Sequence, residues 1–133
     1  MTDKTNGYPP NFKPDEFYCT CEHDDCDGHP PDPAATRHLA WTLQAIRSSV
    51  GVPLTINSGY RCPRHNADVG GVKNSYHLKG IAADLKPHGV TPKELHEAIE
   101  GLVIAGQIPA GGMGLYNSFV HYDTRYQRGR WDG

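Results

Sequence analysis

Apolar side chains recur at helical spacing in two segments, at Leu39, Leu43, Ile46 and Val50 and again at Leu95, Ile99, Leu102 and Val103. Residues three and four apart lie on one face of a helix, so each segment predicts a helix with one buried face. Asp32-Pro33 supplies an N-cap and a first-turn proline for the first helix, predicted over residues 33–50 and ended by Gly51. Thr91-Pro-Lys-Glu94 is a capping box for the second helix, which Gly106 ends.

Short runs of apolar and β-branched residues predict strands at residues 52–57, 80–85, 111–116 and 119–123. Asn117-Ser118 joins the last two as a tight hairpin turn. The connection from Ser58 to Pro63 is rich in turn residues, and His65 and Asn66 are expected to shape the loop that follows. The order of loop, helix, strand, strand, helix and hairpin indicates an α+β fold in which helices flank a small antiparallel sheet.

A chain of 133 residues is expected to form a single domain over residues 1–133, because this length buries roughly two thirds of the unfolded surface. Residues 1–31 contain several prolines and an acidic run, so they predict a loop-rich N-terminal arm. Phe12, Phe17 and Tyr18 are the side chains expected to anchor this arm to the body.

The charge balance excludes some classes of partner. A formal net charge of −2 gives no reason to expect nucleic acid or a membrane as partner, and we expect a monomer. No apolar stretch approaches the roughly 20 residues that cross a bilayer. Eight histidines are more than usual for this length, which slightly favours metal binding or proton transfer.

The four cysteines are unevenly placed, with Cys19, Cys21 and Cys26 near the start and Cys62 alone. Three interpretations stay open: free thiols, one or two disulfides, or a second metal site that His29 could complete. The spacing is not a strong zinc signature, and the first two interpretations together are favoured.

Histidines and a carboxylate form the candidate chemistry. His77 and Asp84 flank Gly80, so a loop histidine and a strand aspartate can face the same point. Antiparallel pairing could bring His121 beside Asp84, and Asp123 shares the strand face of His121. Singly, each residue is more simply explained as structural. Together, two histidines and one carboxylate make a three-ligand zinc set with one position left for water.

The string Ser75-x-His77-x-x-Gly80-x-Ala82-x-Asp84, with a later Phe-Val-His121-x-Asp123, resembles the zinc D-Ala-D-Ala peptidases, whose fold is shared with hedgehog signalling domains. It is similar in particular to the short branch of single-domain peptidases and phage endolysins. The resemblance continues through Ser58-Gly-Tyr-Arg61-Cys-Pro-x-His65-Asn66, Val69-Gly-Gly71 and Trp131, and covers about residues 12–131.

The resemblance implies a Zn²⁺ cofactor held by His77, Asp84 and His121. It implies that Arg61 meets a substrate carboxylate or carbonyl, although Arg61 could instead brace its loop through backbone carbonyls. Ser75 would hold the peptide or orient Asp84. The implied substrate is the stem or cross-bridge peptide of bacterial peptidoglycan, with carboxypeptidase and endopeptidase action both open.

One position departs from the family pattern. Several branches carry a Glu or Asp three residues before the last zinc histidine as catalytic base, and here that position is Ser118. Asp123, the nearest acid on the same strand face, is therefore assigned as the base, with orientation of an imidazole as its alternative role. Ser118 also leaves open a non-catalytic zinc-containing wall-binding module or a phage structural protein.

The start of the chain bears on localisation. Met1–Asn6 lacks the basic and apolar regions of a signal peptide. We therefore expect synthesis in the cytoplasm and action on the cell wall after a phage-type release.

Overall fold

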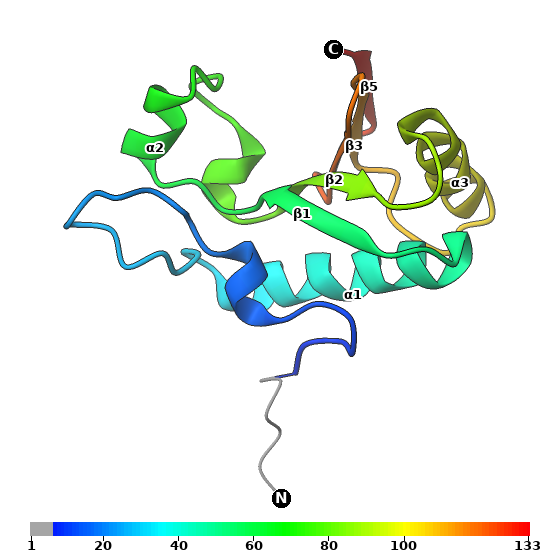
Figure 1. The fold of residues 1–133 in the computed structure, drawn as a ribbon, viewed down its shortest axis with the longest axis horizontal. Helices are drawn as coiled ribbons and strands as arrows, with labels where there is room; N and C mark the ends of the chain where they lie inside the picture. The colour runs from blue at the N-terminus through cyan, green and yellow to red at the C-terminus, as the bar shows by residue number, and fades with distance from the viewer. Residues whose placement is uncertain (1–6) are drawn as a thin grey trace, which may run out of the picture.

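The structure, a computed structural model, describes residues 7–133 (Figure 1). The hexapeptide 1–6, on which the expectation about a signal peptide depends, lies outside the described residues. The helices are α1 Pro33–Val50, α2 Pro63–Asp68 and α3 Pro92–Ile104, with 3₁₀ turns η1 Pro14–Phe17 and η2 Tyr76–Lys79. The strands are β1 Leu54–Ser58, β2 Ala82–Pro87, β3 Gly112–Leu115, β4 Val120–Asp123 and β5 Gly129–Asp132. None of the helices in the described part is long and apolar enough to cross a membrane.

Both long helices begin and end where the sequence predicts. The Asp32 carboxylate accepts a hydrogen bond from the Ala35 amide at 3.3 Å, and Gly51 closes α1 with a φ of 73°. At the start of α3 the Thr91 hydroxyl accepts from the Glu94 amide at 3.1 Å, and the Glu94 carboxylate accepts from the Thr91 amide at 3.0 Å. The predicted capping box is thus confirmed.

The five strands form one sheet in the order β1-β2-β4-β3-β5. Three of the pairs are antiparallel, including the predicted hairpin of β3 and β4, while β5 runs parallel to β3. The predicted α+β fold is confirmed, and β5 makes the sheet mixed. The sequence did not predict β5, because Gly129-Arg-Trp-Asp132 is short, has no β-branched residue and has only one large apolar side chain.

The segment after Pro63 is helical, so the loop expected around His65 and Asn66 was wrong. Proline is tolerated at the first position of a helix, where the missing amide has no partner to lose. Cys62 precedes it as N-cap, and its sulfur accepts a hydrogen bond from the His65 amide. In Figure 1, α2 lies on the opposite side of β1 from α1.

One face of the sheet packs against the helices. Side chains alternate between the two faces along each strand. On the face toward the helices, Ala83 and Leu85 from β2 and Val120 and Tyr122 from β4 are fully buried. They join the buried stripes of α1 and α3 in a single core. Each fully buried large apolar side chain contributes about 1.5–3 kcal/mol. The residues between them, Asp84, His121 and Asp123, therefore project from the other face.

The arm is anchored by the aromatic residues that the sequence singles out. Phe12 and Phe17 are each only 1% exposed and belong to the core, with Tyr8 beside them, whereas Tyr18 is half-buried. The arm therefore packs on the body although it contains only one short 3₁₀ turn among its described residues.

Candidate active site

Three side chains from separate elements meet on the sheet face opposite the core. Asp84 and His121 lie directly across from each other in the antiparallel pairing of β2 and β4, as predicted. His77 reaches the same point from η2. One ligand atom from each of the three lies within 4.8 Å of the others. The register of two strands and one 3₁₀ turn therefore assembles the predicted triad.

A backbone carbonyl fixes the orientation of His77. Its Nδ1 lies 2.7 Å from the Gly59 carbonyl oxygen, which can only accept, so Nδ1 donates and Nε2 keeps its lone pair. The buried Nε2 lies 3.3 Å from Asp84 Oδ1, but no described residue gives it a hydrogen bond of good geometry. A buried nitrogen lone pair beside a carboxylate is a donor set that suits a cation.

A buried carboxylate orients His121. Its Nε2 lies 2.7 Å from Asp123 Oδ2, and its Nδ1 lies 3.0 Å from Asp84 Oδ1. Asp123 is 0% exposed and also accepts a hydrogen bond from the Gly112 amide at 3.0 Å. The Arg125 guanidinium donates two more, from Nε at 2.8 Å and from Nη2 at 2.7 Å. With Nε2 donating to Asp123, Nδ1 is the atom that His121 offers to a metal.

The spacing of the ligand atoms suits zinc. Two ligands bound at about 2.0–2.1 Å to a tetrahedral ion lie about 3.3–3.4 Å apart. The separations from Asp84 Oδ1 to His77 Nε2 and His121 Nδ1 are 3.3 and 3.0 Å. Both separations are close to the spacing of ligands around a tetrahedral ion.

The charges also favour a cation. Burial raises the pKa of Asp84, but hydrogen bonds and charge from His121 and His77 outweigh it and hold that pKa well below its usual range. Burial likewise raises the pKa of Asp123, and its hydrogen bonds with Arg125 and His121 bring it well below the ordinary value. Burial lowers the pKa of His121, but its two carboxylate partners raise it overall. Both carboxylates are thus ionised at neutral pH.

The triad opens into a cleft of about 630 Å³. The cleft is lined by Arg61, Val69, Gly70, Gly71, Val72, Asn74, Ser75, Tyr76, His77, Asp84, Tyr116, His121, Arg125 and Trp131. Tyr76, Tyr116 and Trp131 form its aromatic wall. Tyr60 lines a different cavity. The cleft is large enough for several atoms of a peptide beside the triad.

The two residues predicted to bind substrate both line the cleft. Arg61 is partly buried, which lowers its pKa, and no described residue accepts a hydrogen bond from its Nε. Ser75 caps η2, and its hydroxyl oxygen accepts from the His77 amide at 3.2 Å. Within the described chain, Ser75 therefore orients the turn that carries His77.

Sequence reasoning missed Arg125 and the Gly59 carbonyl. The Arg125 guanidinium is held by Asp123 and stacks over the Tyr76 ring at 4.2 Å, with Trp131 at 5.1 Å. Its position two residues after Asp123 was the available signal, since it follows the ligand strand directly. The Gly59 carbonyl gives no side-chain signal at all.

Comparisons with known proteins agree with this geometry. A zinc D-Ala-D-Ala carboxypeptidase of Streptomyces albus G is 50% identical over 46 residues, which are 34% of this chain and 18% of that relative. The match therefore spans less than a fifth of the relative's length. A sequence model of the family described as peptidase M15 matches residues 10–123, a span that includes His77, Asp84 and His121. The family predicted from the sequence is confirmed, and the chain belongs to the peptidase M15 family.

Proposed function

We propose that this protein is a zinc-dependent peptidase that hydrolyses amide bonds in the peptides of bacterial peptidoglycan. The observation that carries the proposal is the convergence of His77 Nε2, Asp84 Oδ1 and His121 Nδ1 at the floor of an open cleft. Family membership and the relative named as a zinc D-Ala-D-Ala carboxypeptidase support the same chemistry and substrate class.

His77, Asp84 and His121 would hold the zinc ion. When bound, zinc polarises a substrate carbonyl and lowers the pKa of a water ligand toward about 7. Each histidine is held in one orientation by an acceptor behind it, the Gly59 carbonyl or the Asp123 carboxylate. Such partners fix the tautomer and ring direction, so the ligand nitrogens need little rearrangement on binding.

Two arginines supply the charge that a peptide substrate would meet. Arg61 and Arg125 both line the cleft, and the guanidinium of each can pair with a substrate carboxylate or carbonyl. Arg125 is rigid because Asp123 and Tyr76 hold it, whereas the Arg61 Nε lacks a partner within the described chain. We assign Arg61 to substrate binding, and Ser75 to positioning of His77.

The role of Asp123 follows from its surroundings. A general base must reach the water whose proton it takes. Asp123 is 0% exposed, does not line the cleft, and already accepts from His121, Arg125 and Gly112. Of the two roles weighed from the sequence, these contacts support positioning of His121 over proton transfer.

A non-catalytic wall-binding or phage structural module is the second candidate. It is favoured by one observation: among the described residues that line the cleft, Asp84 is the only carboxylate. Ser118, which takes the place of the base in other branches, is exposed in the turn between β3 and β4. A protein of this kind would bind zinc and wall peptides without cleaving them.

Mass spectrometry of muropeptides separates these functions. Zinc-loaded protein is incubated with purified peptidoglycan, with and without a chelator, and His77→Ala serves as the inactive control. Loss of a terminal residue from stem peptides indicates a carboxypeptidase, and cleaved cross-links indicate an endopeptidase of the endolysin type. Intact muropeptides together with retained wall binding would contradict the peptidase and favour the binding module.

A further inference from the structure

A second cluster of metal-ligating side chains lies away from the cleft. The sulfur atoms of four cysteines all lie within 4.8 Å of one another, although one of the four is distant in sequence. The four residues are Cys19, Cys21, Cys26 and Cys62. Cys19 and Cys62 are buried, and Cys21 and Cys26 are half-buried. Every cysteine of the chain is therefore gathered at one point.

The sulfur positions match a metal site. A tetrahedral zinc with Zn–S bonds of about 2.3 Å places its sulfurs about 3.8 Å apart. Cys21 Sγ and Cys62 Sγ are 3.6 Å apart. A disulfide joins two sulfurs at about 2.05 Å and does not require all four to be neighbours. We propose that a second, structural zinc ion is bound by four thiolates, those of Cys19, Cys21, Cys26 and Cys62.

Backbone amides support the sulfurs as they do in thiolate–metal sites. The Cys62 amide donates to Cys19 Sγ at 3.4 Å, and the His65 amide donates to Cys62 Sγ at 3.4 Å. Such hydrogen bonds stabilise charge on a thiolate. Binding forms four Zn–S bonds and releases the thiol protons to solvent, with no oxidation or reduction.

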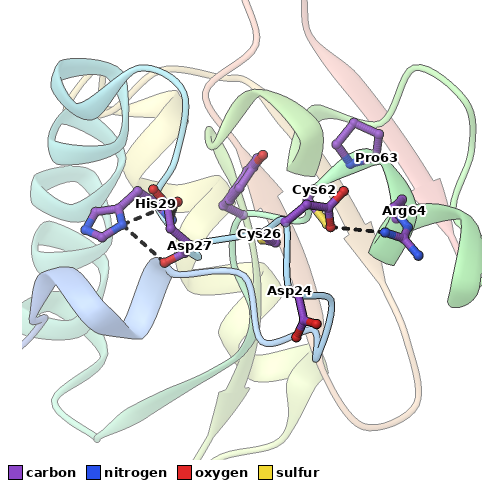
Figure 2. A pocket seen from close by; sticks show the side chains of 9 residues that line it. Asp24, Cys26, Asp27, His29, Cys62, Pro63 and Arg64 are labelled. Carbon is purple, nitrogen blue, oxygen red and sulfur yellow. Dashed lines mark hydrogen bonds and ion pairs between the residues drawn. The ribbon is translucent and has the colours of Figure 1, made fainter.

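A cavity of about 480 Å³ gives the site a path to solvent. Cys26 and Cys62 lie in its wall with Asp24, Asp25 and Asp27 nearby (Figure 2). Carboxylates in the wall of the cavity attract a divalent cation. His29, which the sequence offered as a possible ligand, is not in the cluster. Its Nδ1 forms a hydrogen bond with the Asp27 backbone carbonyl, and its ring points away from Cys26 and Cys62 in Figure 2.

The proposed ion also explains how the arm is held. Residues 18–32 are all described and contain neither helix nor strand, so few backbone contacts fix them. Three of the thiols lie in this segment, and the fourth, Cys62, caps α2. A metal bound there closes the loop and ties it to the body, as structural zinc does in small domains.

The same ion would brace the active site, a consequence that rests on the proposed function. Cys62 follows Gly59, whose carbonyl orients His77, and Arg61, whose amide donates to the His77 carbonyl at 3.1 Å. The segment 59–62 thus runs from one metal site to the other. Loss of the four-cysteine ion should loosen Arg61 and His77 without removing a catalytic ligand.

Metal content tests this proposal without reference to activity. Protein loaded with Zn²⁺ and freed of excess metal is measured for zinc per chain, and for thiols per chain after denaturation with chelator and without reductant. We expect about two zinc ions and four thiols in the parent, and one ion in either Cys26→Ser or His77→Ala. The control His29→Ala changes a residue in the wall of the same cavity and should keep both zinc ions.

A Co²⁺ spectrum of the folded parent covers the case in which Cys26→Ser does not fold. Thiolate-to-cobalt absorption should be present in the parent and in His77→Ala. Three results would each overturn the four-cysteine site. The parent could bind one zinc ion that is lost in His77→Ala, it could contain fewer than four free thiols, or its Co²⁺ complex could lack thiolate absorption. An inactive protein that binds two zinc ions would contradict only the peptidase.

Discussion

Replacing Asp123 by asparagine separates the two roles assigned to this residue. The side chain keeps its shape but loses its charge, and its new donor replaces one of two acceptors. Oδ2 accepts from His121 Nε2 and Arg125 Nη2, whereas Oδ1 accepts from the Gly112 amide and from the Arg125 amide and Nε. At least two hydrogen bonds are thereby replaced by contacts between donors, and Arg125 loses its ionic partner. Asp123→Asn therefore perturbs both stability and the orientation of one metal ligand.

The magnitudes follow from the contacts. Breaking a buried ion pair costs about 3–5 kcal/mol. Because the Arg125 side chain is 22% exposed, solvent screening reduces the expected loss in the free energy of unfolding to about 2–3 kcal/mol. Loss of a partner that orients a metal ligand weakens metal binding about 10–100-fold, which is about 1.4–2.8 kcal/mol.

Two assays test this prediction: urea denaturation of the metal-free protein and zinc affinity by competition with a chromophoric chelator. The exposed Asp132→Asn is the matched control, and we expect it to change the free energy of unfolding by at most about 0.5 kcal/mol and leave zinc affinity unchanged. Unchanged zinc affinity in Asp123→Asn, with a loss of kcat of about 10²–10⁴-fold at saturating zinc, would refute the positioning role and restore Asp123 as the base.

Three further predictions concern the cleft and its supports. Arg61→Lys should lower kcat/KM on muropeptides about tenfold or more, because lysine lacks the planar guanidinium that pairs with a carboxylate. The control is Arg64→Lys, at an exposed arginine. Equal kinetics of the two variants would argue against substrate contact by Arg61. Gly114→Ala should destabilise the fold by about 1–3 kcal/mol, since a Cβ there overlaps the Trp131 indole, whereas Gly101→Ala in α3 meets nothing within 4 Å and should stabilise it by about 0.5–1 kcal/mol in thermal unfolding. Glu100→Gln should cost about 0.5–1 kcal/mol at pH 7, because Arg130 and Arg128 lower the pKa of Glu100. A lowered pKa gives stability that is present above the unfolded-state pKa and is lost as the pH falls through the folded-state pKa. In urea denaturation the difference in stability between Glu100→Gln and the parent should therefore close as the pH falls through the lowered pKa of Glu100. A difference that does not depend on pH would contradict the ion pair.

The sequence predicts the helix boundaries and the pairing of two metal-ligand candidates, because short-range patterns determine both. The α1 and α3 boundaries follow from caps and from apolar spacing, which act within a few residues. The meeting of Asp84 and His121 also follows, because alternation along a strand places a side chain on one face and antiparallel pairing brings the strands together. Both results rest on periodicity.

The features that the sequence does not predict depend on contacts between distant segments. The strand β5 exists because Gly112–Leu115 offers it an edge, and its own residues have little strand preference. The four cysteines meet because the arm folds back over the start of α2, which their uneven spacing does not reveal. The confinement of Asp123 comes from Arg125 and Gly112, one beyond the strand and one on its neighbour.

Anomalous diffraction at the zinc absorption edge tests the central claim most directly. A crystal of zinc-loaded protein should show an ion about 2.0–2.2 Å from His77 Nε2, an Asp84 carboxylate oxygen and His121 Nδ1, with its remaining position open to the cleft that Arg61 and Arg125 line. An ion bound elsewhere only, or three side chains that stay apart around an empty centre at saturating zinc, would contradict the metal centre and with it the proposed peptidase.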